Sequence, residues 1–498
     1  PGGVTVKANG GASIYSFAGG VSIGGKASLG AAIAYNYVGG DPDDPTSSKV
    51  NRVEAYVTDS AVTSSAGSIS VLAGFDNPAT VPSAPSNAVG ILTLSMPSTQ
   101  TSQITSVAIG AATTKEGGKF AGGGSFGINF NRNVIRAYAA DTAAAGALAL
   151  NANQSISIQG GNTARIYVGV GGLAYSNGGS ATGAAVSTNE ITNDIYAAID
   201  GGTATATNGD LSVTAITDAR IINVCVGLAA SKGNAPFAGA GSIALNWIHG
   251  TADAHIAGAN SATAKGPVKV TASDTSEIDV GAGGIAVNQG GTAAVGAAIA
   301  YNYIGGDRDN AAATTVNSAK AYISDSSVTS QTGAIEVVAK GMQKTIAVAV
   351  GGASSDKFAL GGSVAVNYSK AVNEAAIKVT AANKSTTVSA GGAVTVSALD
   401  DMDVDVGAGG LARAAQGAAV GVAVTVNDLR NSTSALVDAG GGTLNVSNGD
   451  LTVLANSDSR VINVALGLAL SSSGSFAGSG SIALNWLHNT VDARVANI

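Results

Sequence analysis

The stretch Gly241-Ser-Ile-Ala-Leu-Asn-Trp-Ile-His249 returns almost unchanged as Gly480-Ser-Ile-Ala-Leu-Asn-Trp-Leu-His488. A second match joins the residues from Ala31 to Asp41 with those from Ala297 to Asp307. The two matches define two super-repeats, 1–265 and 266–498. They lie 239 residues apart (from 241 to 480) and 266 residues apart (from 31 to 297). This difference predicts an insertion at about 74–101, which is rich in proline and is expected to form a surface loop.

Each super-repeat divides into four related modules. Every module contains four short pieces in which side chains alternate with period two, and no stretch has a convincing helical pattern with caps. Period two indicates strands, and neighbours that resemble one another indicate a solenoid, because each module covers the core of the next. We therefore predict an all-β fold, a parallel β-solenoid (β-helix) of eight repeated modules without substantial helix. The modules begin near Gly2, Gly67, Gln154, Gly209, Gly266, Gly333, Gly391 and Gly449.

An asparagine follows a hydrophobic residue by three positions in every module, and we find no other position that recurs so simply. In a parallel stack, equivalent side chains lie directly above one another, so each amide can donate to the one above and accept from the one below. We predict a structural ladder, not a ligand site, formed by Asn36, Asn129, Asn189, Asn246, Asn302, Asn367, Asn427 and Asn485. A continuous ladder favours one coil of about 57 residues per module over two of about 28, and eight layers would span about 40 Å.

Composition excludes several classes of protein. The chain of 498 residues has 69 glycines, nine prolines, 45% hydrophobic and 11% charged residues, which fits neither collagen nor a disordered chain. A net charge of −7 without a basic run argues against nucleic-acid binding. The uncharged stretch 280–306 is rich in glycine and has counterparts along the chain, so we expect no membrane-spanning helix. We also expect the ends to be uncapped, as in the interior of a longer array.

One strand face predicted in each module carries only small residues. In the stretch from Ile222 to Ala229 this face presents Asn223, Cys225, Gly227 and Ala229. Because a solvated sheet face normally carries polar or charged side chains, we expect this one to be covered, either by another strand of the same coil or by a neighbouring filament. We favour a contact between chains or layers for part of it. Cys225 aligns with Ala465 and is expected to be a buried, inert thiol.

Candidate chemistry is sparse, and we predict no catalytic, cofactor-binding or metal-binding residues. Gly123-Gly-Ser-Phe-Gly127 fits a nucleophile elbow, but Ser125 occupies a position that holds serine in other modules. Asp401, Asp403 and Asp405 share one strand face and are expected to be solvated, as are the acidic loops 41–44 and 307–309. Calcium binding is the alternative at these three places. His249 and His488 are expected at strand ends on the surface, and Trp247 and Trp486 are expected to pack over an edge, with sugar stacking as the alternative.

These motifs resemble the repeat regions of giant bacterial filamentous adhesins, the filamentous-haemagglutinin-like and leukotoxin-like exoproteins. The resemblance rests on the Gly-x-hydrophobe-x-Val-x-Ala pieces, the Ala-x-Ile pieces with Ser/Thr turns, and Gly-Ser-Ile-Ala-x-Asn. It implies a secreted or cell-surface stalk or fibre, not an enzyme, in adhesion, biofilm matrix or cell–cell contact. Expected partners are copies of itself and glycans or cell surfaces. The alternatives are a carbohydrate- or cell-binding module that uses solenoid loops and, more weakly, a polysaccharide-degrading β-helix enzyme.

Overall fold

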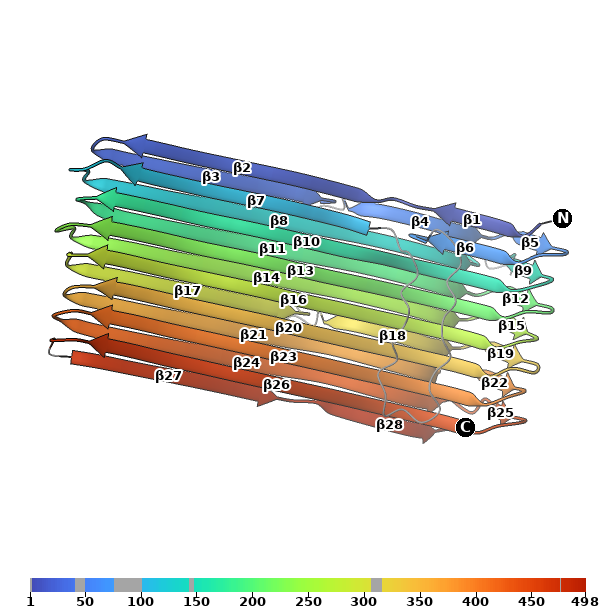
Figure 1. Cartoon of the computed structure of the whole chain (residues 1–498). Coiled ribbons are helices and arrows are strands. Elements are labelled where there is room, and N and C mark those ends of the chain that lie inside the picture. The colour runs from blue at the N-terminus through green and yellow to red at the C-terminus, as the bar shows by residue number, and fades with distance from the viewer. Residues whose placement is uncertain (1, 41–49, 76–100, 143–146, 306–315, 475) are drawn as a thin grey trace.

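The chain forms a flat stack of parallel strands, as a computed structural model shows (Figure 1). The structure describes residues 2–40, 50–75, 101–142, 147–305, 316–474 and 476–498. All regular structure in these residues is strand, and three parallel sheets run through the stack, so the predicted all-β parallel solenoid is confirmed. Among the described residues, no helix is long and apolar enough to span a bilayer.

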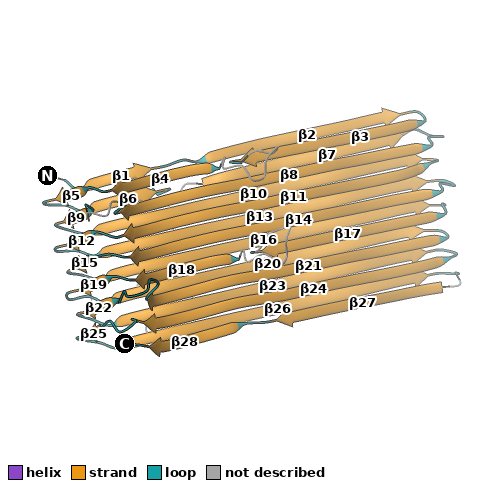
Figure 2. Ribbon diagram, turned by 180° about the vertical axis from the view of Figure 1, so that it is seen from behind, coloured by secondary structure: helices purple, strands orange, loops and turns teal. Residues whose placement is uncertain are grey.

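Two long sheets face each other, and a short sheet closes the coil at one end (Figure 2). The first sheet contains β1 (Val4–Ala8), β2 (Ala12–Gly24), β6 (Ile69–Ala73), β7 (Thr101–Thr114), β10 (Ile156–Asn177), β13 (Leu211–Lys232), β16 (Val268–Gln289), β20 (Ile335–Ser355), β23 (Val394–Ala414) and β26 (Leu451–Ser471). The second sheet contains β3 (Ala27–Val38), β4 (Asn51–Thr58), β8 (Phe120–Ala140), β11 (Ser180–Asp200), β14 (Phe237–Ala257), β17 (Ala293–Ile304), β18 (Asn317–Ser324), β21 (Phe358–Lys378), β24 (Ala418–Asp438), β27 (Phe476–Leu487) and β28 (Thr490–Ala496). The short sheet contains β5 (Ala61–Ser64), β9 (Ala149–Ala152), β12 (Thr203–Ala206), β15 (Ser261–Ala264), β19 (Ser327–Ser330), β22 (Thr387–Ala390) and β25 (Leu444–Val446).

Each module is one coil, which we call a layer and number from one to eight along the chain. In layer four the chain runs along β13, turns, returns along β14 and passes through β15 before β16 begins the next layer. Leu211 of β13 lies beside Val268 of β16, so one coil per module is confirmed. The four short pieces predicted in each module are wrong for layer four, where β13 contains the first two and β14 contains the last two. In other layers some pieces remain separate strands, as β17 and β18 do.

The stack continues without a change of architecture across the boundary between the super-repeats. β13 of the first super-repeat pairs with β16 of the second over its full length. The insertion and the acidic loops lie outside the described residues for the most part: 76–100, 41–49 and 306–315 are not described. The origin of the segment within a longer array stays a prediction.

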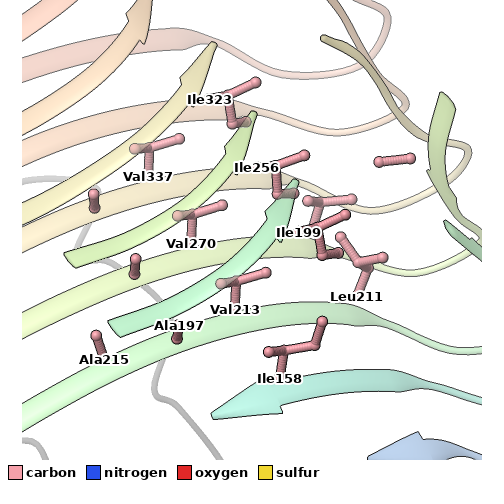
Figure 3. Packing of buried hydrophobic residues seen from close by; sticks show 14 of the residues in the cluster. Ile158, Ala197, Ile199, Leu211, Val213, Ala215, Ile256, Val270, Ile323 and Val337 are labelled. Carbon is pink, nitrogen blue, oxygen red and sulfur yellow. The ribbon is translucent and has the colours of Figure 1, made fainter. Parts of the chain in front are cut away.

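Large aliphatic side chains fill the broad end of the coil, beside the short sheet. Val213, Val270 and Val337 of the first sheet stack in one column and face Ile256 and its neighbours from the second sheet (Figure 3). All of these side chains are buried. The largest cluster of buried aliphatic side chains therefore lies at this end, where three sheets surround it, and a smaller cluster that includes Ile166, Ile221 and Ile278 lies farther along the coil.

Toward the other end, which we call the tip because the two long sheets are joined there by tight turns, the interior contains alanine and glycine. One inward column is glycine in all eight layers: Gly20, Gly110, Gly172, Gly227, Gly284, Gly351, Gly410 and Gly467. A Cβ atom added at any of them would lie closer than 3.0 Å to a backbone carbonyl oxygen of the second sheet. The two sheets are thus in backbone contact at this column, which leaves no room for a side chain.

This backbone contact shows what packs on the face of small residues that includes Asn223, Cys225 and Ala229. Asn223, Cys225 and Ala229 are buried against the second sheet of the same coil. The expectation that a neighbouring filament covers part of this face is therefore wrong. The large side chains of the same strand, including Val224 and Leu228, point outward instead.

Candidate functional site

The eight asparagines of the predicted ladder form one column in the second sheet, on its inward face. The Nδ2 of Asn189 donates to the Oδ1 of Asn246 at 3.0 Å, and the Nδ2 of Asn246 donates to Asn302 at 2.9 Å. The same bond joins every other pair of neighbours, at 2.7–2.8 Å. The column is buried through layers one to seven. It therefore satisfies buried amides and fixes the register of each layer on the next.

The first sheet braces this ladder. Asn223 of β13 donates from Nδ2 to the Oδ1 of Asn246 at 2.8 Å and accepts a bond from Ser187 at 2.9 Å. Asn463 of β26 donates in the same way to Asn485. These bonds cross between the two long sheets of a layer, so they hold the sheets together beside the buried side chains of Ile221 and Ile248.

A second polar seam lies inside the coil, between the ladder and the aliphatic core, and the sequence did not reveal it. It begins with asparagines, of which Asn133 donates to Asn193 at 2.9 Å. Farther along the stack it contains two buried carboxyl groups. Asp274 accepts from Ser276 at 3.2 Å and from Asn317, and Asp400 accepts from Asn373 and Asn431, both at 2.9 Å.

Burial dominates the protonation of both acids. It raises the pKa of Asp274 to about 8, against the opposing effect of hydrogen bonds from Ser276 and Asn317. It raises the pKa of Asp400 to about 6, against bonds from Asn431, Ser457 and Asn373. At neutral pH Asp274 therefore retains its proton, and its role in the seam is that of a neutral hydrogen-bonding group.

Stability should fall as pH rises from about 4 to about 8. The folded state holds the Asp274 proton over this range, whereas the unfolded chain releases it above its ordinary pKa, so rising pH favours unfolding by up to about 1.4 kcal/mol per pH unit. Asp274→Asn should reduce this slope between about pH 6 and 8 by up to about 1.4 kcal/mol per pH unit, leaving the contribution of Asp400 at lower pH and that of His255 above about pH 6.5. Urea unfolding at several pH values measures it, and a variant with the wild-type slope in that range would contradict the assignment.

An aromatic column covers part of the outward face of the second sheet. It consists of Tyr56, Tyr138, Tyr196, His255 and Tyr322 in successive layers. Tyr56 and Tyr138 stack with ring centroids 5.1 Å apart, and His255 stacks on Tyr322 at 4.5 Å. Both carboxylates beside His255 come from the same sheet. Its Nδ1 lies 2.6 Å from Asp253, and its Nε2 lies 3.0 Å from Asp200.

The two carboxylates hold His255 in its charged form. Burial by itself lowers the pKa of His255, but hydrogen bonds to Asp200 and Asp253 outweigh it and raise the pKa to about 9. Burial also raises the pKa of Tyr196, whose hydroxyl donates to Asp200 at 2.5 Å. A protonated imidazole between two carboxylates cannot accept a proton, so the cluster is a poor general base. It acts as a charged clasp between layers three and four.

The clasp should contribute stability at low pH and lose it at high pH. Because the folded pKa of His255 lies above its unfolded value, the contribution is complete below about pH 6.5 and is lost as pH rises through about 9, a change of up to about 3 kcal/mol. His255→Asn should be less stable than wild type at pH 6, and the difference should shrink by pH 9.5. Urea unfolding of both proteins at the two pH values checks this, and a constant difference would refute the clasp.

Asp401, Asp403 and Asp405 lie on the outward face of β23, and Arg460 neutralises part of their charge. Asp403 pairs with Arg460 of the next layer at 2.8 Å, and Asp405 lies 3.8 Å from the same guanidinium. Burial, with Asp403 and Asp458, raises the pKa of Asp401. The described residues contain no group of three or more side chains suited to a metal ion. The calcium alternative at 41–44 and 307–309 falls outside the described residues.

The remaining candidates lie within the repeat. Ser125 is buried on the inward face in the middle of β8, not on the strand-to-helix turn that a nucleophile elbow requires. Cys225 is buried as expected, and burial raises the pKa of its thiol to about 11. His249 lies within β14 and not at a strand end, whereas His488 follows β27. Trp247 is buried beside Tyr301, and Trp486 is exposed.

The sheets and the ladder define the chain as a parallel β-solenoid with one large coil per repeat. No protein-family model matches the chain. No curated protein and no solved structure gives a significant match either.

Proposed function

We propose that this chain is a structural repeat segment of an extracellular bacterial filament or surface adhesin, which serves as a stalk or fibre in adhesion, matrix or cell–cell contact. One observation carries the proposal: the asparagine ladder passes through all eight layers without a break. A continuous polar column that fixes register is a device for repetition along an axis. It supports a role in which the length of the stack matters.

The outward charges support the same role. On the first sheet, Arg220 pairs with Asp279 of the next layer at 2.5 Å and with Glu277 at 3.2 Å. Lys344 of the following layer pairs with Glu277 at 3.1 Å. Charged groups of successive layers thus neutralise one another along the stack and reinforce it.

Antibodies against the chain provide the test. On intact cells of the source bacterium they should label surface fibres or the surrounding matrix, without permeabilisation. Labelling that appears only after lysis would refute an extracellular role. The control is an antibody against a cytoplasmic protein, which must label lysed cells alone.

Binding of carbohydrate is the second candidate. Exposed aromatic rings on the second sheet favour it, since sugar rings stack on such faces: Tyr35 is 49% exposed and Trp486 is 45% exposed. A glycan array should then give a defined set of ligands, whose binding is lost in Trp486→Ala. If no glycan on the array binds, carbohydrate binding is refuted and only the structural role remains. Turnover of an acidic polysaccharide would instead favour the enzyme alternative.

A further inference from the structure

The outward face of the first sheet is apolar toward the tip. Val224 is 49% exposed, Leu228 37% and Ile285 44%, and large side chains of other layers, including Leu173, Val348 and Leu411, are also exposed on this face. A sheet face in water normally carries polar side chains, and patches of more than a few hundred Å² are rare on monomers. The second sheet already packs on the inward face, so none of the described residues of the coil packs over the outward one.

Two outward columns on this face alternate between glycine and large residues. The first reads Phe17, Val107, Gly169, Val224, Gly281, Val348, Gly407 and Val464, and the second reads Gly19, Ile109, Gly171, Val226, Gly283, Val350, Gly409 and Leu466. From layer two onward both columns have large residues in even layers, which we call ridges. Both have glycine in odd layers, which we call troughs.

The fold itself does not require the trough glycines. A Cβ atom at Gly281 or Gly407 would meet no atom within 4 Å, and one at Gly169 would touch Val107 at an ordinary 4.0 Å. None of the three has a positive φ. Glycine weakens a strand interior, and where the fold does not need it, it often marks the close approach of another backbone or ligand. These troughs therefore point to something outside the coil.

We propose that this face docks against the same face of a second copy of the chain, with the ridges of each copy in the troughs of the other. A two-fold axis along the strand direction, between layers four and five, brings each even layer opposite an odd one. Val224 then faces the partner's Gly281, and Gly169 faces the partner's Val348. A two-fold axis along the stack would instead put ridge on ridge. The two solenoids must therefore run antiparallel.

The size of the face suits a stable dimer. Eight layers at ~4.8 Å and about seven residues at ~3.3 Å, from the Val224 column to the Ala230 column, give about 900 Å² per copy, which exceeds the roughly 800 Å² per partner of a standard interface. A lipid bilayer is a less suitable occupant, because fluid acyl chains gain nothing from alternate glycine rows. Interdigitation of small and large side chains is instead how paired sheets exclude water.

This inference deepens the proposed function, since it specifies how copies would bundle, and it rests on that function only for its biological setting. Its test uses the purified chain alone. A monomeric chain would refute the dimer and leave a surface location untouched, whereas cytoplasmic labelling would refute the location and leave the dimer untouched.

Trough filling is the decisive experiment. The variant G169V/G281V/G407V should sediment as a monomer at concentrations where wild type is a dimer, with association weakened at least ten-fold. Its thermal unfolding midpoint should not fall, because valine favours strands and the sites have space. The matched control is G241V/G362V/G480V on the outward face of the second sheet, where a Cβ atom also meets nothing within 4 Å. This control should remain a dimer.

Cysteine pairing tests the antiparallel arrangement. Ile23 in layer one and Leu470 in layer eight occupy one outward column and are both exposed. Chains with Ile23→Cys mixed with chains with Leu470→Cys should form a disulfide-linked heterodimer, and neither variant should cross-link alone. Monomeric wild type, a dimeric trough-filled variant, or a monomer that floats with phospholipid vesicles would overturn the proposal.

Discussion

Gly284→Ala should destabilise the solenoid by about 3 kcal/mol or more, because a single methyl group has no space between the two long sheets. The added Cβ atom would lie closer than 3.0 Å to the carbonyl oxygen of Ala297. Relief requires the sheets to move apart, which would strain the glycine contacts of the neighbouring layers as well. Overpacking of this kind typically costs about 1–3 kcal/mol, and more where backbone must shift. The midpoint of urea unfolding, followed by far-ultraviolet circular dichroism, measures the loss.

The same strand provides the control. Gly281 lies three residues earlier on the outward face, where a Cβ atom meets nothing within 4 Å. Gly281→Ala should therefore be neutral or stabilise by about 0.5–1 kcal/mol, since alanine restricts the unfolded chain. Equal effects of the two substitutions would show that the sheets are not in backbone contact at this column.

The sequence was sufficient to predict that the strands stack in parallel layers, but not which face of each strand points into the coil. Period-two alternation and an asparagine in every module were enough for parallel layers, one coil per module and the ladder. The glycine column at Gly227 and Gly284 recurs just as regularly, contrary to our expectation that only the asparagine does. It was missed because glycine is abundant throughout the chain, so its recurrence stands out only when layers are aligned residue by residue.

The hydrophobic pattern was also ambiguous about which face is inside. In β13 the large residues Val224 and Leu228 alternate with Cys225 and Gly227, and a sequence reading does not say which set faces the core. Close backbone approach reverses the ordinary rule, because only the small set fits inside. The His255 clasp could not be predicted either. Asp200 lies 55 residues before His255 in sequence, and modules of unequal length hide that spacing.

Asn246→Ala should be the most costly single substitution in the ladder, with a loss of about 3–6 kcal/mol. Three buried groups would lose their partner at once: the Nδ2 atoms of Asn189 and Asn223 and the Oδ1 of Asn302. Each buried polar group left unsatisfied costs about 1–3 kcal/mol. Asn246→Asp should restore little, because an ionised carboxylate accepts both bonds but cannot donate to Asn302, and its charge would be buried.

The last rung of the ladder is the matched control for this prediction. Asn485 accepts the same two kinds of bond, from Asn427 and Asn463, but its side chain is exposed. Water can replace the lost partner there, so Asn485→Ala should cost no more than about 1 kcal/mol. Urea unfolding of both variants, with amide hydrogen exchange to locate the weakened layers, makes the comparison. A loss at Asn246 as small as that at Asn485 would mean that the ladder fixes register without stabilising the stack, and that the aliphatic core beside the short sheet supports it.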